Sequence, residues 1–291
     1  MSLVSFNMTG ASNSPQHCLQ AVLGSHDVIC LQETWLHESN TEHISQAFPR
    51  HAVISKCGFD TSVPLIGRPY GGLATCVRDL PFEVISVESR RVQPTVIKVG
   101  GTDVVLLNCY FPYDKHDAHS RAEFVDMLSV ISVLLSRFEA TPVILAGDIN
   151  CDLSRESWRS RAFAEMCGRH CLNIVSLAPE SDLRVSYSKN VLDRTHSSLI
   201  DWFVLSSEFG FETSGAIVSH APLLVSDHNP VSLTVSFPAY APPPGTATAG
   251  MGSGSPSPEI MFAPGKLTAD NWLRYQFVCD EALSCIIPPH E

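Results

Sequence analysis

Acidic, amide and imidazole side chains follow several apolar segments of this chain. They come directly after LVSF, ICLQ, VILAG and LLVS, and they are Asn7, Glu33, Asp148 with Asn150, and Asp227 with His228. The ends of buried strands are where an α/β scaffold presents its reactive groups. We therefore expect these side chains to share one site.

The residue types point to a particular chemistry. Carboxylate and amide oxygens suit Mg²⁺, which prefers about six oxygen ligands. An ion of this kind next to a histidine and a further aspartate suits the hydrolysis of a phosphate ester, in which a carboxylate activates water and the histidine donates to a phosphoryl oxygen. Taken singly, each residue also fits a plainer explanation, such as the Asp148–Asn150 pair in a turn. The combination carries the prediction.

The composition limits the kind of protein. The chain has 291 residues, of which 44% are hydrophobic and 17% are charged, and this balance is typical of a globular protein. The formal net charge of −11 excludes a polybasic mode of nucleic-acid binding but allows a local basic groove.

The cysteines and the N-terminus bear on the compartment. No two of the ten cysteines form a Cys-x-x-Cys pair, and several lie in apolar runs where a reduced thiol packs as a small hydrophobe. The opening MSLVSFNMTG is not a secretory signal, and the apolar run around residues 124–138 is too short to span a bilayer. We predict an intracellular protein, nuclear or cytoplasmic and not secreted, with no membrane partner.

Short apolar runs alternate with amphipathic helices over residues 1–237. The predicted strands are Leu3–Phe6, Val28–Gln32, Ala52–Ser55, Leu73–Val77, Val84–Val87, Thr95–Val99, Val104–Tyr110, Val143–Ala146, Leu199–Leu205 and Val231–Phe237. The predicted helices are Gln16–Leu23, His37–Phe48, Ser120–Phe138 and Arg155–His170. This pattern predicts a four-layered α/β sandwich, in which two packed, mostly antiparallel sheets are flanked by helices.

The last part of the chain has a different composition. Residues 238–258 are rich in Pro, Gly, Ser and Ala and are predicted to form a linker. Residues 259–291 are predicted to form a short helical tail, which is too small to build a core alone.

The order of the motifs resembles the endonuclease/exonuclease/phosphatase superfamily. The matching segments, in the order of that superfamily, are SFNMTG, LQETW, NCYFP, AGDIN, SLIDWFVLS and SDHNPV. By this resemblance Glu33 would hold the divalent ion, with Asn7 and Asp227 beside it. Asp148 would activate water, Asn150 would bind the phosphate, Asp201 would hold the tautomer of His228, and Tyr110 would touch the scissile phosphate or the leaving oxygen.

One branch of the superfamily fits best. Apurinic endonucleases and the endonucleases of LINE-type retrotransposons carry tyrosine in the central motif, as this chain does at Tyr110, whereas secreted deoxyribonucleases carry histidine. The segments GRPYGGLAT and LQETWLHESN are similar to LINE endonucleases, and NWLRYQFVCDEAL is similar to the connector toward a reverse transcriptase. Thr9 stands where apurinic endonucleases place an acid. The resemblance implies a DNA endonuclease that uses Mg²⁺, with Mn²⁺ able to replace it, and leaves a 3′-hydroxyl nick.

Two alternatives stay open at this point. The first is a repair-type apurinic endonuclease, or another phosphodiesterase or phosphatase of the same superfamily. The second is a catalytically silent remnant of a retroelement. Partners implied by the leading interpretation are DNA and, in a longer natural product, a reverse transcriptase domain or element RNA. Arg155, Arg159 and Arg161, just after the AGDIN motif, are the candidates for contacts with the DNA backbone.

Overall fold

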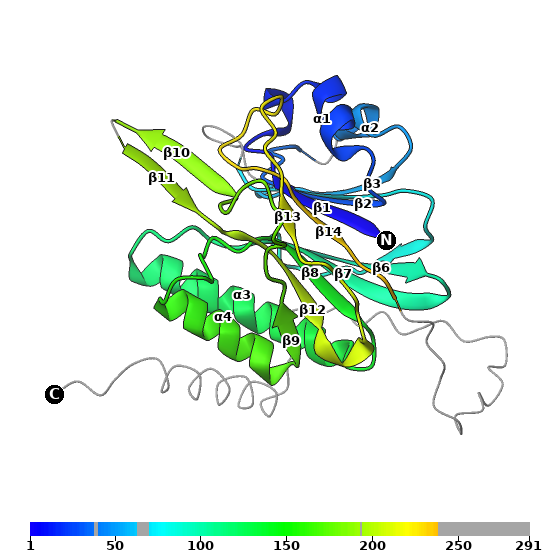
Figure 1. The fold of residues 1–291 in the computed structure, drawn as a ribbon, viewed down its shortest axis with the longest axis vertical. Coiled ribbons are helices and arrows are strands. Elements are labelled where there is room, and N and C mark those ends of the chain that lie inside the picture. Colours follow the sequence, from blue (N-terminus) through cyan, green and yellow to red (C-terminus); the bar gives the residue numbers. More distant parts are fainter. Residues whose placement is uncertain (38–39, 63–69, 193, 238–291) are drawn as a thin grey trace. The chain divides into compact units, whose positions relative to one another are not determined.

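Two six-stranded sheets stack face to face in this computed structural model, which describes residues 1–37, 40–62, 70–192 and 194–237 (Figure 1). The first sheet has the strand order β13 (Ile217–Val218), β14 (Val231–Thr234), β1 (Ser2–Asn7), β2 (Val28–Gln32), β4 (Leu73–Val77) and β3 (Ala52–Lys56). The second has the order β5 (Phe82–Val84), β6 (Val92–Val99), β7 (Thr102–Tyr110), β8 (Val143–Asp148), β12 (Asp201–Ser206) and β9 (Leu172–Ile174).

Helices cover the outer faces of both sheets (Figure 1). Helices α1 (Gln16–Leu23) and α2 (Glu42–Ala47) lie on the first sheet, and α3 (Ala118–Arg137) and α4 (Trp158–Arg169) lie on the second. Two short 3₁₀ turns, η1 (Ala11–Asn13) and η2 (Ser207–Phe209), complete the helical elements of the described residues. The predicted four-layered sandwich is confirmed. None of these helices has both the length and the apolar character needed for a bilayer span.

Each sheet contains one parallel pair of strands near its centre. In the first sheet β1 runs parallel to β2, and in the second β7 runs parallel to β8, while the other neighbours are antiparallel. All five residues of β2 and all six of β8 are buried, because each strand has a sheet or a helix layer on both faces. The mostly antiparallel character that the sequence predicts is therefore confirmed, with the parallel pairs as the exception.

The helix boundaries follow from their caps. Asp117 accepts a hydrogen bond from the backbone N–H of Ser120 and caps α3, whose buried face includes Phe124 and Ile131. Ser157 and Ser160 form a capping box at the start of α4. For this reason α4 begins at Trp158, whereas the apolar pattern alone predicted a start at Arg155.

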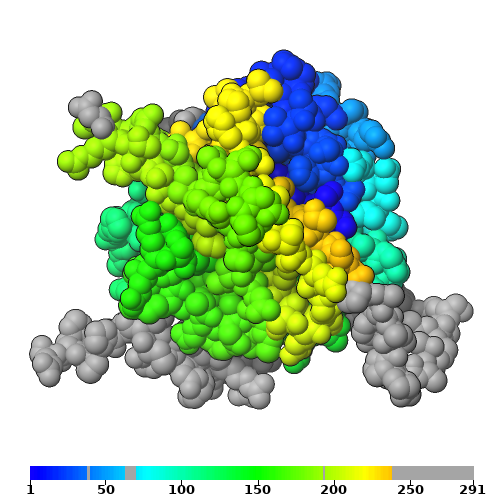
Figure 2. Space-filling view, viewed as in Figure 1, coloured from blue at the N-terminus to red at the C-terminus, as the bar shows by residue number. Residues whose placement is uncertain are grey.

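Several strands differ from the prediction. Strand β5 ends at Val84 instead of continuing to Val87, because its next partner, Pro94, accepts a hydrogen bond from Ile85 but has no N–H to return one. The sequence also gave no signal for β9, for β13 or for the hairpin of β10 (Tyr187–Val191) and β11 (Arg194–Ser198). This hairpin projects from the body of the protein (Figures 1 and 2), and most of its side chains are exposed or half-buried, so it shows no hydrophobic alternation.

The described residues belong to a compact unit that the contacts place at Met1–Ala239. The predicted linker at 238–258 and the predicted tail at 259–291 lie outside the described residues.

Gly147 lets β7 and β8 approach closely enough to align their ends. Its φ is 145°, and a Cβ atom built there would lie 1.9 Å from the carbonyl oxygen of Cys109.

We predict that Gly147→Ala lowers the free energy of unfolding by at least about 2 kcal/mol, since backbone must move to make room. Gly168→Ala is the matched control, because nothing lies within 4 Å of its Cβ position in α4. It should raise stability by roughly 0.5–1 kcal/mol. Urea unfolding measures both, and equal effects would contradict this explanation.

Candidate active site

Five strand ends meet at one rim of the sandwich. Asn7 ends β1, Tyr110 ends β7 and Asp148 ends β8, while Asp201 begins β12, and Glu33 follows the end of β2. The register aligns Tyr110 with Asp148 and Asp148 with Asp201. The first sheet therefore supplies Asn7 and Glu33, and the second supplies the other three residues.

Asn7 joins the carboxylates of the two sheets. Its fully buried side-chain amide donates to Glu33 Oε1 at 3.0 Å and to Asp148 Oδ2 at 2.9 Å, and its carbonyl oxygen accepts the N–H of Thr9 at 3.0 Å. Both ends of this side chain are thus engaged. The Asn7 amide therefore fixes the orientation of the Glu33 and Asp148 carboxylates.

The segment that carries Glu33 is held in an unusual conformation. The φ angles of Glu33 and Trp35 are 49° and 55°, in the left-handed region that non-glycine residues rarely adopt. The indole N–H of Trp35 donates to Glu33 Oε2 at 3.1 Å, and the backbone N–H groups of Thr34 and Trp35 donate to Gly72 and Gly71. These bonds fix the direction of the Glu33 carboxylate. Thr9 and Asn150, with φ angles of 49° and 50°, show the same conformation at the same rim.

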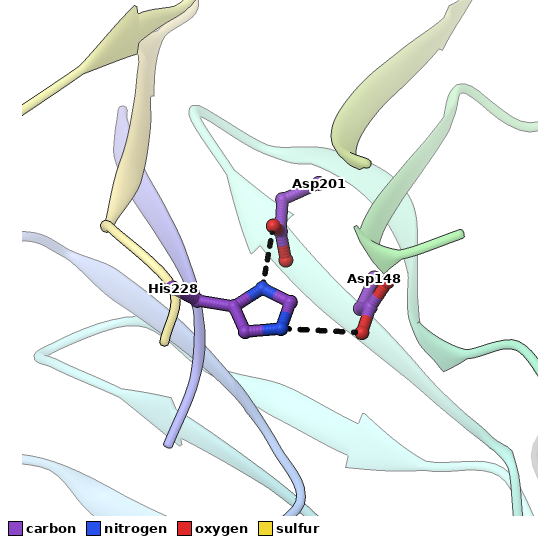
Figure 3. Close-up of side chains that lie close together, drawn as sticks. All are labelled: Asp148, Asp201 and His228. Carbon is purple, nitrogen blue, oxygen red and sulfur yellow. Dashed lines mark hydrogen bonds and ion pairs between the residues drawn. The ribbon is translucent and has the colours of Figure 1, made fainter. Parts of the chain in front are cut away.

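His228 lies between two aspartates (Figure 3). Its Nδ1 is 2.8 Å from Asp201 Oδ2, and its Nε2 is 3.9 Å from Asp148 Oδ2. All three residues are buried. The pairing with Asp201 places the proton of a neutral ring on Nδ1 and leaves Nε2 facing Asp148.

The electrostatics of this group are unusual. Burial disfavours the imidazolium, but the carboxylates of Asp201, Asp148 and Glu33 outweigh it and raise the pKa of His228 to about 9. Burial and the nearby charge of Asp201 raise the pKa of Asp148 to about 7. Burial, together with the nearby charges of Glu33 and Asp148, also raises the pKa of the Tyr110 phenol.

Asn150 and Asp227 differ in how they relate to this centre. The backbone N–H of Asn150 donates to Asp148 Oδ1 at 2.8 Å, and its side-chain amide donates to Phe111 O and to Asp148 Oδ2. The carboxylate of Asp227 instead forms an ion pair with Lys189 of the β10–β11 hairpin at 3.0 Å and is 38% exposed. Asn150 thus contacts the central carboxylate of Asp148, whereas the carboxylate of Asp227 is paired with Lys189.

The prediction that Arg159 contacts DNA is wrong. Its side chain is only 3% exposed, pairs with Asp114 at 3.4 Å and donates to the carbonyl oxygen of Pro112 at 2.6 Å, with its guanidinium over the rings of Phe124 and Trp158. The position follows from α4, which turns this face toward α3. Arg155, just before the helix, and Arg161 are exposed and pair with Asp152 and Glu156.

Three further residues support the site and were missed from the sequence. Trp35 orients Glu33, as described above. Ser226 donates to Asn7 O at 2.7 Å and accepts the backbone N–H of His228 at 3.0 Å. The ring of Tyr187 meets that of His228 edge-on at 5.0 Å. Trp35 and Ser226 lie inside the LQETW and SDHNPV segments, but no role was predicted for either. For Ser226 the signal was its position, because a serine two residues before a functional residue often caps its backbone N–H.

The donor set fits a divalent cation. Glu33, Asp148 and Asp201 bring three carboxylates to the rim, and Asp201 Oδ1 is buried without a hydrogen-bond partner. Asp148, Asp201 and His228 bring one polar atom each to within 4.8 Å of the others, which concentrates further charged groups at this rim. Hard oxygen ligands with unbalanced negative charge favour ions such as Mg²⁺ or Mn²⁺.

A family model described as the Endonuclease/Exonuclease/phosphatase family matches residues 4–228. The chain belongs to this family. The match begins within β1 and ends at His228, so it contains every residue of the rim described above. Enzymes of the endonuclease/exonuclease/phosphatase family are divalent-metal-dependent hydrolases that act on phosphate esters, phosphodiesters among them.

Solved structures share the endonuclease/exonuclease/phosphatase fold. The AP endonuclease LMAP from Leishmania major matches with 18% identity over 80% of this chain and 86% of that chain, at a TM-score of 0.61. The endonuclease domain of TRAS1, a telomere-specific non-LTR retrotransposon, matches with 15% identity over 80% and 97%, at 0.55. A mannosyl-6-phosphatase from Bacteroides thetaiotaomicron matches with 18% identity over 81% and 100%, at 0.56. No curated protein matches by sequence.

The raised pKa of His228 predicts a pH dependence of stability. Above the unfolded-state pKa of about 6.5 and below about 9, folded His228 keeps a proton that the unfolded chain has lost. The folded state then binds more protons, so the free energy of unfolding falls as pH rises. We expect the metal-free protein to lose stability between pH 7.5 and 9 more steeply than His228→Gln, as measured by urea unfolding. Parallel slopes for the two proteins would contradict the pairing of His228 with Asp201.

Proposed function

We propose that this protein is a divalent-metal-dependent DNA endonuclease that nicks one strand and leaves a 3′-hydroxyl and a 5′-phosphate. The observation that carries the proposal is the convergence of Glu33 and Asp148 on the amide of Asn7, with the Asp201–His228 pair facing Asp148. Such a site combines a place for a cation, a base for water and a donor for the phosphate.

The cation would be Mg²⁺, with Mn²⁺ able to replace it. Glu33 would hold it, with Asn7 orienting this carboxylate, and Asp227 would join when its carboxylate leaves Lys189. When bound, the ion neutralises the negative charge that develops on the phosphate oxygens.

Asp148 would take the proton of the attacking water. Burial and the charge of Asp201 raise the pKa of Asp148, which makes its carboxylate a stronger base than an exposed aspartate. Asn150 holds Asp148 through two hydrogen bonds and keeps it oriented. The side-chain amide of Asn150 would donate to a phosphate oxygen in place of its long bond to Asp148 Oδ2.

His228 would stabilise the transition state. A pKa of about 9 keeps its ring protonated at neutral pH, and Asp201 fixes the ring so that Nε2–H can donate to a non-bridging oxygen. Tyr110 would contact the scissile phosphate or the leaving oxygen. Its raised pKa keeps the phenol protonated, so that it acts as a hydrogen-bond donor.

A groove beside the site supports a polymeric substrate. A cavity of about 740 Å³ is lined by Tyr110, by the basic side chains Arg90, Arg91 and Lys115, and by the acidic side chains Glu88, Glu123 and Asp126. Arg91 pairs with Glu123 and Arg90 pairs with Asp60, so a phosphate backbone would have to replace these acidic partners. The Arg91 guanidinium lies 5.4 Å from the centre of the Tyr110 ring. Basic side chains of this kind contact nucleic-acid phosphates in an otherwise acidic chain. The exposed Arg155 and Arg161 remain proposed contacts with the DNA backbone.

The biological setting that we propose is a LINE-type element, in which the nick primes reverse transcription. Tyr110 and the segments around residues 31–40 and 67–75 support this branch, as does the likeness to the TRAS1 endonuclease domain. The partners would be DNA inside the cell and a reverse transcriptase domain or element RNA. The likeness to an AP endonuclease favours a repair enzyme as the second candidate. Thr9 argues against that candidate, because apurinic endonucleases resemble this chain but place an acid at this position.

We predict that the wild-type protein nicks supercoiled plasmid in Mg²⁺ or Mn²⁺, and that Asp148→Asn, Glu33→Gln and His228→Gln each lower the rate by roughly 10²–10⁴-fold. Asp103→Asn is the control, because Asp103 is exposed and pairs with Lys98. Polymerase extension of the nick identifies a 3′-hydroxyl. Parallel assays on intact DNA, abasic DNA, RNA and a phosphomonoester separate the candidates. A wild-type protein that cuts none of these would contradict the proposal and favour a silent remnant.

A further inference from the structure

A chain of buried polar side chains crosses the core between the two sheets. Its members come from both sheets: Gln32 of β2 and Thr75 of β4 on one side, and Asn108 of β7 and Gln93 of β6 on the other. All four are at most 3% exposed. They lie in the layer where the sheets otherwise meet through apolar side chains such as Leu3, Cys30 and Leu106.

The hydrogen bonds of this chain run from sheet to sheet. Gln32 Nε2 donates to Asn108 Oδ1 at 2.8 Å. Asn108 Nδ2 donates to Ala74 O at 3.0 Å, to Thr75 Oγ1 at 3.2 Å and to Leu31 O at 3.3 Å. Thr75 Oγ1 donates to Gln93 Oε1 at 2.6 Å, and Gln93 Nε2 donates to Ile54 O at 3.3 Å.

The location of these side chains ties them to the active site. Gln32 directly precedes Glu33. Asn108 lies two residues before Tyr110 and therefore on the same face of β7, and it is aligned with Ala146, two residues before Asp148. The bond between Gln32 and Asn108 thus joins the strand that carries Glu33 to the strands that carry Tyr110 and Asp148.

Apolar packing and hydrogen bonds constrain the two sheets differently. The hydrophobic effect is not directional, so apolar layers tolerate small shifts of one sheet along the other. A hydrogen bond weakens steeply with distance and angle, and a fully satisfied buried network selects one arrangement. Catalytic geometry needs this selection, because a misplacement of about 1 Å can cost about 10²-fold in rate.

From these observations we propose that Gln32, Asn108 and Thr75 are positioning residues, which set the relative position of the two sheets and so the placement of Glu33 against Asp148 and Tyr110. The inference rests on the proposed function. It adds that the polar chain acts on the rate of the bond-breaking step and not only on stability.

The test separates positioning from stability with four variants. Gln32→Met and Asn108→Leu each leave a buried partner without its hydrogen bond and should lower the Tm. The double variant removes both polar groups, so its Tm should recover toward that of the wild type. Ser206→Ala is the control: Ser206 is buried at the far end of β12 from Asp201, and it bonds to the backbone of Val143.

We expect the double variant to keep at least about a tenfold loss of kcat at saturating DNA and Mg²⁺, with the KM for DNA within about twofold of the wild type. Ser206→Ala should keep the wild-type kcat even where its Tm falls. A double variant that regains both Tm and kcat would overturn the proposal, since catalysis would then follow stability alone.

A second pair of variants covers the case in which the double variant does not fold. Thr75→Ser keeps the hydroxyl that links Asn108 to Gln93, and Thr75→Val removes it. The serine variant should retain kcat and the valine variant should lose it. Equal kcat values for the two would overturn the proposal.

Binding of Mn²⁺, followed by electron paramagnetic resonance, distinguishes a failure of the inference from a failure of the proposed function. A wild-type protein that binds Mn²⁺ but cuts no substrate contradicts the proposed function. The positioning role is then supported if the stable double variant binds Mn²⁺ several-fold more weakly, and contradicted if it binds equally well. A wild-type protein that neither binds nor cuts would overturn both.

Discussion

Repulsion between carboxylates at a buried rim is the constraint on which the rest of this structure depends. Glu33, Asp148 and Asp201 are brought together where two sheets end, and burial strengthens the interaction between their charges. Hydrogen bonds from the Asn7 amide, the imidazole of His228 and the indole N–H of Trp35 reduce this repulsion. The negative charge that remains would attract a divalent cation, and the cation would in turn stabilise the negative charge of a phosphate transition state.

The topology makes this concentration of charge possible. Each sheet has one parallel pair near its centre, and the carboxyl ends of all four strands reach the same rim. β12 runs antiparallel to β8, so its first residue, Asp201, lies beside the last residue of β8. Because the two halves of the site belong to different sheets, their alignment depends on what joins the sheets. Asn7 does so at the rim, and Asn108 does so deeper between the sheets.

The sequence predicted the centre of the site better than its surroundings. Polar residues that follow apolar runs, such as Asn7 and Asp148, are readable because strand ends are simple to recognise, and the family resemblance added their roles. Arg159 was misplaced because a charged residue in a helix pattern suggests an exposed face, whereas here aromatic rings and Asp114 enclose it. The pairing of Asp227 with Lys189 joins residues 38 positions apart, and Lys189 lies on a hairpin that the sequence did not reveal. Gln32 and Asn108 read only as interruptions of apolar strands, since their hydrogen bonds exist only after the sheets pack.

The most direct test of the account is a crystal structure of the protein with Mn²⁺, examined in an anomalous difference map. We expect a peak at the rim, with Glu33 among the ligands and on the side that faces Asp148, at metal–oxygen distances of roughly 2 Å. A peak that lacks Glu33, or no peak at the rim at millimolar Mn²⁺, would contradict the claim that the two sheets together form one metal-dependent centre.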